Sequence, residues 1–479
     1  MGESYNGVFQ EMEETEPVSP TGQYFTSSVI SVSVVAVLES QHPIDDSQTT
    51  SLLRHVFLPI NPRFSSVMVK DKNGIKHWKK VEVKLQDHVK VPTFPQGKSP
   101  DFYDGCFTDY LSKVATDQLP LTKPLWEIHI VKYPTTTAAG NVVFKLHHAL
   151  GDGYSLMGAL LSCLQRADNP AIPLTFPAFN PKTEARRAHV SICRNFSRAV
   201  SGVINTVCDF GWSLLKSGVI EDDQTPVRSG DDGAAFRPIT ISTLTFSIDE
   251  IKQVKASLGV TLNDVVCGVL FLGIRQYMQA MNHEQRNAQS TALVLLRTRN
   301  IAGYKSVAEM VESDAESSWG NQFAFLHVPV PELSEHEPNN PLSFVLKAQK
   351  IIQRKRNSAA VFLTGKLLEM LRKYRGPEVT AKYIHSTLKN TSMTVSNIIG
   401  PVEQMSLSDQ PVKGLYFMVA GVPQSLTITM LSYMGKLRLA VGTENGLIEA
   451  PKLKACIQNA FDIIFKAAVD HYSPAVNNI

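Results

Sequence analysis

The sequence predicts a mixed α/β (or α+β) protein with two domains. The chain has 479 residues, which is longer than one hydrophobic core usually supports. Stretches typical of strands and helices alternate through most of it, without the tight repeat of a parallel βαβ fold. A segment rich in Pro and then in acidic residues interrupts this pattern from about residue 169 to residue 238. We therefore predict two α/β layers joined by a crossover segment.

Changes in composition give the predicted boundaries. Residues 1–20 are acidic and aperiodic, and are expected to form a disordered tail. Residues 21–180 are assigned to the N-terminal domain and residues 236–479 to the C-terminal domain. Between them, residues 181–235 form the crossover, with a helical stretch suited to a membrane interface.

Residues with β-branched side chains mark the strands of the first half. Ser28–Leu38 reads as a buried strand, and Glu127–Lys132 and Asn141–Leu146 follow as two more. Tyr154–Arg166 has leucines at helical spacing and is predicted to be a helix.

The second half repeats this mixture. Thr261 to Asp264 has the pattern of a capping box that opens a long apolar helix. The other predicted elements are strands Ile239–Phe246, Thr291–Arg297, Phe323–Pro329, Met393–Ile398 and Leu437–Thr443, a helix from Asp249, and a last helix Lys452–Val469.

Bulk composition excludes several classes. A net charge of +3 without a basic stripe among aromatic residues argues against nucleic-acid binding. The six cysteines are scattered and form no Cys-x-x-Cys pair, which predicts free thiols and no metal site. The acidic N-terminus lacks the charge pattern of a secretory signal. A spanning helix needs about 20 apolar residues, and the candidate Ala199–Cys208 is too short, so only a helix lying on a membrane is expected there.

The chemistry is predicted at the run from His147 to Gly153, which reads His-His-Ala-Leu-Gly-Asp-Gly. Because side chains alternate along a strand, His148 is expected on the face of Phe144 and Leu146, and His147 on the opposite face. One histidine is therefore the base and the other is structural. Imidazole is the natural general base for a hydroxyl group. A single histidine at a strand end is usually structural, but the complete His-His-x-x-x-Asp-Gly pattern is more specific.

This run resembles the plant-type wax ester synthase/diacylglycerol acyltransferase family, within the HxxxD acyl-CoA-dependent acyltransferases. Four further segments agree in the family's order: Pro124-Leu125-Trp126, Asn263-Asp264, Trp319-Gly320-Asn321 and Ser396-Asn397-Ile398-Ile399-Gly400-Pro401. The resemblance implies two chloramphenicol-acetyltransferase-like domains with an active-site tunnel between them. It also implies that His148 is the catalytic base, reached by acyl-CoA from one side and by the acceptor alcohol from the other.

The resemblance also suggests roles for other residues. Asp152, beside Gly153 in the turn, is expected to pair with an arginine, for which Arg299 is the best match; a solvated strand-end charge is the other reading of Arg299. Asn263 has two readings, as a group that orients substrate or stabilises the oxyanion, and as part of the helix cap with Asp264. The predicted tunnel residues are Asn263, Asp264, Asn321, Ser396 and Asn397, whereas Trp126 is expected in the core.

The expected reaction is direct transfer in a ternary complex, because no nucleophile elbow or cysteine triad is present in the sequence. No metal or redox cofactor is expected, and acyl-CoA is a substrate. The expected acceptor is a fatty alcohol or diacylglycerol, so the protein should contact a membrane surface, at the cytosolic face of the endoplasmic reticulum, with the plasma membrane or a lipid droplet as alternatives. Two segments are candidates for that contact: Phe196–Leu215 and the basic Lys347–Arg375, for which a solvated face is the alternative.

Three other functions stay open. A condensation domain of peptide synthesis shares the histidine run but normally adjoins further modules. An acyltransferase of specialised metabolism is disfavoured, because the Asp209-Phe-Gly-Trp212 segment lies in the crossover instead of near the C-terminus. A catalytically silent lipid-binding module is the third alternative.

Overall fold

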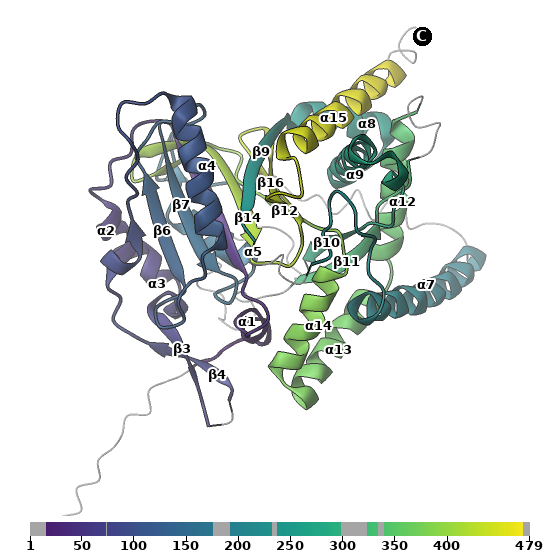
Figure 1. Ribbon diagram of the computed structural model, residues 1–479, viewed down its shortest axis with the longest axis horizontal. Helices are drawn as coiled ribbons and strands as arrows, with labels where there is room; N and C mark the ends of the chain where they lie inside the picture. Colours follow the sequence, from purple (N-terminus) through teal and green to yellow (C-terminus); the bar gives the residue numbers. More distant parts are fainter. Residues whose placement is uncertain are drawn as a thin grey trace, which may run out of the picture.

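The computed structural model describes residues 16–72, 74–175, 192–231, 237–297, 323–333 and 340–472. Side chains are described for these residues except 192–204, 296, 297, 323, 471 and 472. In the described part, two large β-sheets lie beside each other, and helices cover their outer faces (Figure 1). The predicted mixed α/β architecture is confirmed.

The first sheet has seven strands and contains the histidine run at the end of a central strand. Its order is β5 (Val89–Lys90), β6 (Trp126–Val131), β7 (Gly140–His147), β2 (Ser33–Ser40), β14 (Gln410–Ala420), β13 (Met405–Leu407) and β8 (Gln165–Arg166). All neighbours are antiparallel except β5 and β6. The predicted strands before the motif are therefore confirmed, with β2 beginning five residues later than expected.

Strand alternation divides the residues of β7 between two cores. Phe144 and Leu146 pack in one cluster with helix α5 (Gly153–Ser162). Val143 packs in another cluster with helix α4 (Pro100–Thr116) and with strands of the second sheet. Trp126 is fully buried, and its indole nitrogen donates to the Phe64 carbonyl at 2.8 Å, as a core residue should. Helix α5 ends at Ser162, earlier than predicted, because the chain then forms the short strand β8.

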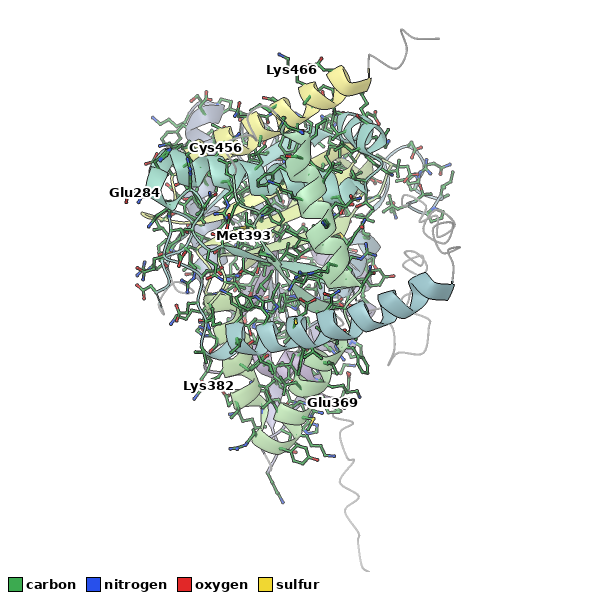
Figure 2. All side chains as sticks on the ribbon, turned by 90° about the vertical axis from the view of Figure 1, so that its right-hand side faces the viewer. Glu284, Glu369, Lys382, Met393, Cys456 and Lys466 are labelled. Atoms are coloured by element: carbon green, nitrogen blue, oxygen red, sulfur yellow. The ribbon has the colours of Figure 1, made fainter. Side chains whose placement is uncertain are left out.

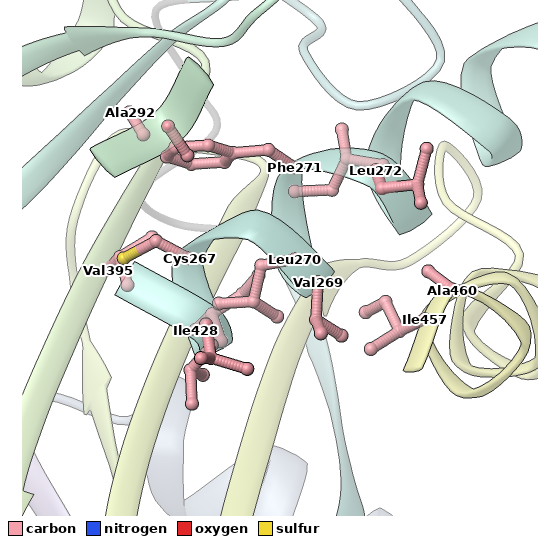
Figure 3. Packing of buried hydrophobic residues seen from close by; sticks show 14 of the residues in the cluster. Cys267, Val269, Leu270, Phe271, Leu272, Ala292, Val395, Ile428, Ile457 and Ala460 are labelled. Atoms are coloured by element: carbon pink, nitrogen blue, oxygen red, sulfur yellow. The ribbon is translucent and has the colours of Figure 1, made fainter. Parts of the chain in front are cut away.

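The second sheet has six strands, in the order β11 (Phe323–Pro329), β10 (Thr291–Arg297), β12 (Met393–Ile399), β15 (Leu426–Tyr433), β16 (Lys436–Glu444) and β9 (Ile239–Ser247). Helices α8 (Ile248–Leu258), α9 (Leu262–Met281), α12 (Leu342–Arg356) and α15 (Ala450–Tyr472) pack on it. Helix α9 lies in the centre of this core, where Phe271 and Leu270 face the sheet and Val269 approaches Ile457 of α15 (Figure 3). Its first turn is the predicted capping box.

The boundary between the sheets differs from the predicted sequence boundary. Residues 405–420 lie in the predicted C-terminal domain, yet β13 and β14 extend the first sheet, and β14 pairs with β2. A bidentate ion pair also joins the halves, since Arg438 of β16 donates to Glu39 of β2 at 2.6 and 2.7 Å. The second half of the chain thus contributes two strands to the sheet of the first half.

The last residues of the predicted disordered tail, 16–20, are structured. Residues 1–15 lie outside the described residues, but Glu16 and Pro17 form β1 (Glu16–Pro17), which pairs with β4 (Lys76–Lys80). Helix α1 (Pro20–Phe25) follows, with Ser19 as its N-cap. A three-stranded sheet results, in the order β1, β4 (Lys76–Lys80), β3 (Ser66–Lys70). The remaining short elements are α2 (Thr49–Leu52), a π-helical turn Leu53–Phe57, α3 (Leu58–Ile60), and 3-10 turns Pro62–Ser65, Leu85–Asp87 and His283–Gln285.

Three helices form a layer beside the second sheet. The crossover contributes α7 (Ile192–Gly218), which packs against α13 (Ala360–Arg375) and α14 (Pro377–Lys389). These helices project from the body of the molecule, with Glu369 and Lys382 at its lower end (Figure 2). Among the described helices, none is by itself both long and apolar enough to cross a bilayer; α8 and α9 meet that measure only as a pair bent by 99°.

Candidate active site

The histidine run leaves β7 in a tight turn. The His147 amide donates to the Leu125 carbonyl at 2.9 Å, and the Leu150 amide donates to the His147 carbonyl at 3.0 Å. Strand β7 therefore ends at His147, and His148 is the first residue of the turn. The predicted alternation holds up to Leu146, but the position of His148 is set by this turn and not by the pleat of the strand.

His147 is held on both ring nitrogens. Its Nδ1 accepts from the Ala149 amide at 3.1 Å, so the ring proton belongs on Nε2, which lies 3.2 Å from Ser31 Oγ. The side chain is buried, and burial lowers the pKa of the His147 imidazole to about 3, with smaller contributions from His148 and nearby lysines. A neutral ring that braces the turn is a structural group and a poor proton acceptor.

His148 lies in a different environment. Its amide donates to the Val32 carbonyl at 2.8 Å, which ties the turn to the start of β2. Its ring lies 4.9 Å from the ring of Phe25, centroid to centroid, and the residue is 6% exposed. Phe25 belongs to an apolar cluster with Tyr24, Ile384 and other residues of α1, β10, α14 and the segment before β2. A base at this position would act in apolar surroundings, where electrostatic effects on a reaction are strong.

Asp152 caps the helix that follows. Its Oδ1 accepts from the Ser155 amide at 2.9 Å and from Ser155 Oγ at 3.0 Å, and the residue is 4% exposed. These bonds fix the N-terminus of α5 relative to the turn. The predicted partner Arg299 and the predicted tunnel residue Asn321 lie outside the described residues.

Gly153 brings the two halves of the chain into contact. A Cβ atom at Gly153 would lie only 2.9 Å from Cδ1 of Ile398, at the end of β12. At Gly400, two residues further, a Cβ would clash with the Ser432 carbonyl oxygen of β15. Both glycines therefore permit close approach, and the motif turn contacts the segment from Ser396 to Pro401 at Ile398.

The Asn263-Asp264 segment contacts the Ser396–Pro401 segment through Asn263. Its Oδ1 lies 3.5 Å from Nδ2 of the exposed Asn397, while Ser396 is buried. The Asp264 carboxylate accepts from the Thr261 amide at 2.9 Å and is buried, so it serves the helix cap. Asn263 thus lies beside Asn397, the residue before Ile398 that meets Gly153, while Asp264 is occupied by the helix cap.

Asp209 and two of the cysteines, which the sequence analysis considered, are buried in the structure. Asp209, in the Asp-Phe-Gly-Trp segment, is buried in α7 and accepts from Lys355 Nζ at 2.7 Å. Burial raises the pKa of the thiols of Cys163 and Cys267 to about 12, so neither is a ready nucleophile. Between the sheets lies a cavity of about 860 Å³. It lies at the Glu39 end of β2, whereas His147 pairs with Ser33 at the other end.

Sequence reasoning missed α1 and the ring of Phe25. The available signal was Ser19-Pro20, a helix N-cap followed by proline at the first helical position, and Ser19 Oγ does accept from the Gly22 amide at 3.2 Å. With six residues, the helix is too short to show periodicity.

Comparison with known proteins gives one consistent result. The wax ester synthase/diacylglycerol acyltransferase catalytic domain matches residues 30–266, and the C-terminal domain of the same family matches residues 319–465. Two Arabidopsis thaliana relatives, wax ester synthase/diacylglycerol acyltransferases 4 and 6, are each 29% identical and cover 92% of this chain, which spans 88% and 91% of their lengths.

The solved structures agree on the fold. A wax ester synthase/diacylglycerol acyltransferase from Marinobacter aquaeolei VT8 has a TM-score of 0.58 at 14% identity, covering 94% of this chain and 99% of its own. The first condensation domain of the calcium-dependent antibiotic synthetase has a TM-score of 0.53 at 12% identity, covering 91% of each chain. At these identities the likeness shows the two-domain fold alone.

Proposed function

Because this chain belongs to the wax ester synthase/diacylglycerol acyltransferase family, we propose that it transfers a fatty acyl group from acyl-CoA to a long-chain alcohol or to diacylglycerol, with His148 as the general base. One observation carries the assignment of the base. His147 is neutral and held on both ring nitrogens, whereas His148 lies at the turn between the halves of the chain, beside an apolar cluster.

The proposed reaction is a direct transfer. The acceptor hydroxyl oxygen attacks the thioester carbonyl while its proton moves to the His148 imidazole. The carbon–sulfur bond of the resulting tetrahedral adduct then breaks, and the proton passes to the leaving CoA thiolate. Burial, which raises the pKa of the thiols of Cys163 and Cys267, disfavours these two residues as carriers of an acyl group.

Other residues position the base and the adduct. Asp152, by capping α5, holds the turn that carries His148. The amides of Asn263 and Asn397 are proposed to border the acyl carbonyl, where a donor would stabilise the developing oxyanion. Arg299 and Asn321 keep the roles that the resemblance implies, as the Asp152 partner and a tunnel residue. No metal or redox cofactor has a step in this scheme.

The proposed setting is the cytosolic face of the endoplasmic reticulum, since both the acceptor and the ester partition into lipid. Confocal imaging of a tagged chain beside an endoplasmic reticulum marker tests this location. A diffuse cytosolic signal would contradict it.

An assay with a panel of acceptors tests the function. Purified protein and radiolabelled palmitoyl-CoA are supplied with hexadecanol, diacylglycerol or a phenolic alcohol. We expect labelled ester from hexadecanol, diacylglycerol or both. Ester formed only from the phenolic alcohol would favour specialised metabolism, and no ester from any acceptor would favour a silent lipid-binding module.

A further inference from the structure

Helix α7 has its polar face inside and an apolar face outside. The buried face of its described part carries Asp209, Ser213, Lys216 and Ser217. The opposite face carries Val207, Leu214 and Leu215, which are 66%, 38% and 46% exposed. Their spacing of seven and eight residues places them on one side of the helix. A helix in water normally has the reverse arrangement, so the outer face of α7 is suited to an apolar environment.

Helix α13 has the same property more strongly. Of its 16 residues, only Ala360 is buried. Phe362, Met370 and Tyr374 are 65%, 58% and 70% exposed, and they follow each other at intervals of eight and four residues along one face. Large apolar side chains gathered on an exposed face usually mark a site of contact with another molecule or a membrane.

The charge on α13 identifies the kind of contact. Helix α13 carries four basic residues, Lys366, Arg372, Lys373 and Arg375, and one acidic residue, Glu369. The Lys366 ammonium lies 5.9 Å from the ring centroid of Phe362, and that of Lys373 lies 5.6 Å from the ring of Tyr374. Aromatic and basic side chains that alternate in this way are typical of helices at the headgroup level of anionic bilayers.

The two helices are neighbours. Helix α7 packs on α13 and α14, and the Ala359 amide before α13 donates to Thr206 Oγ1 of α7 at 3.0 Å. In Figure 2, α7 crosses the face toward the viewer and Glu369 lies below it, on the projecting end. We define the α7–α13 surface as Val207, Leu214, Leu215, Phe362, Lys366, Met370, Lys373 and Tyr374.

Apolar side chains continue from α13 toward His148. Leu368, on the inner side of α13, packs against the cluster that contains Tyr24, Phe25 and Ile384. Phe25 in turn contacts the His148 ring, at 4.9 Å between centroids. Figure 1 shows α1, which carries Phe25, between the first sheet and the α13–α14 pair. An alkyl chain leaving a bilayer at α13 would therefore meet apolar groups on the way to the base.

We propose that the α7–α13 surface docks on a bilayer with anionic headgroups, and that the cluster beneath α13 receives the long-chain acceptor from that bilayer next to His148. The second part rests on the proposed function; the docking does not. A second copy of the chain is a poorer occupant, since a symmetric contact would bring the basic side chains of two α13 helices together.

The basic segment Lys347–Arg375, predicted to contact a membrane, contains one buried and several exposed basic side chains. Lys355 is buried and bonded to Asp209, and Arg354 lies 3.5 Å from the same carboxylate. Lys355 is therefore unavailable to lipid, whereas Lys347, Lys350, Arg354 and Arg356 of α12 are exposed.

Flotation with vesicles tests the docking. The variant Phe362→Ser/Met370→Ser removes apolar contact, and Lys366→Gln/Lys373→Gln removes charge. The matched control is Val91→Ser/Leu121→Ser, at two sites that are each 49% exposed and far from α13 in sequence. The vesicles are phosphatidylcholine with or without phosphatidylserine.

We expect the serine variant to lose roughly tenfold in partition to phosphatidylserine vesicles, because two large side chains leave the lipid. The glutamine variant should lose most of the preference for phosphatidylserine, and the control should match the wild type. Equal flotation of all variants would overturn the docking. So would a wild type that floats with neither vesicle, which would indicate a protein partner instead.

Activity separates the docking from the proposed function. With hexadecanol in vesicles, the serine variant should form ester roughly tenfold more slowly than wild type. With a short-chain alcohol in solution, its rate should stay within about twofold of wild type. Equal losses with both acceptors would overturn delivery through α13. A wild type inactive with both would refute the proposed function, and flotation would still decide the docking.

Discussion

Beyond the pairing of β14 with β2, the two halves of the chain meet at both ends of β2, and these two junctions are built differently. At the Ser40 end, the carboxylate of Glu39 is paired with Arg438, whose guanidinium also lies 5.1 Å from the ring centroid of Tyr416. At the Ser33 end, the junction is Gly153 against Ile398, with two amides at its border and His148 in the same turn. An ion pair thus joins the halves at the Ser40 end, and a close apolar contact joins them at the Ser33 end. Stability and chemistry should therefore respond to different substitutions.

The largest effect should come from His148→Ala. Removal of the base should reduce turnover by about 10²- to 10⁴-fold, while the melting temperature changes little. Ester formation and thermal unfolding of the same preparation check both parts. Comparable losses of activity and stability would mean that His148 is a structural residue and not the base.

At the opposite junction, Arg438→Ala should have the reverse effect. Leaving the Glu39 carboxylate buried without its partner should cost about 2–4 kcal/mol of unfolding free energy, with turnover per folded molecule unchanged at low temperature. Lys252→Ala is the control, since its ion pair with Asp249 is exposed and should cost less than about 0.5 kcal/mol. Urea unfolding measures both. Equal costs would show that the far junction is not held by charge.

A smaller change should follow Gly153→Ala, because the added methyl group meets Ile398 Cδ1. We expect a loss of about 1–2 kcal/mol together with a fall in turnover. The double variant Gly153→Ala/Ile398→Val should recover part of both, since the shorter side chain makes room. Strictly additive losses would show that this contact does not couple the motif to β12.

A further effect concerns the pH dependence of stability. The pKa of His147 is about 3 in the folded protein and near 6.5 when unfolded. The unfolded chain therefore binds more protons between these values, so His147 makes stability rise with pH from about 3 to 6.5. His147→Asn, which keeps an acceptor near Nδ1, should flatten the dependence of melting temperature on pH between about 4 and 6.5. An unchanged slope would contradict the buried, neutral assignment.

Much of the fold could be predicted because the relevant signals are local. Runs of β-branched residues gave β6 and β7 to within a residue or two, and the Thr261–Asp264 pattern gave the start of α9. Strands β14 and β15 were not predicted. That β14 completes the first sheet depends on pairing with β2, which lies far away in the sequence.

The candidate site was predictable only in part. The motif identified the turn, but the environments that distinguish His147 from His148 come from Ser31, Val32 and Phe25. Likewise, Lys355 reads as a surface charge until Asp209, 146 residues earlier, is placed beside it. Burial of a charge depends on its partner, and a partner that is distant in sequence leaves no local signal.

The most direct test of the central claim is chemical rescue of the base. His148→Gly leaves space for a free imidazole in the turn, and single-turnover ester formation is measured with and without added imidazole. We predict a very slow reaction that accelerates in proportion to the imidazole concentration, while His147→Gly shows no such response. A folded His148→Gly protein that forms ester at the wild-type rate without imidazole would contradict the account.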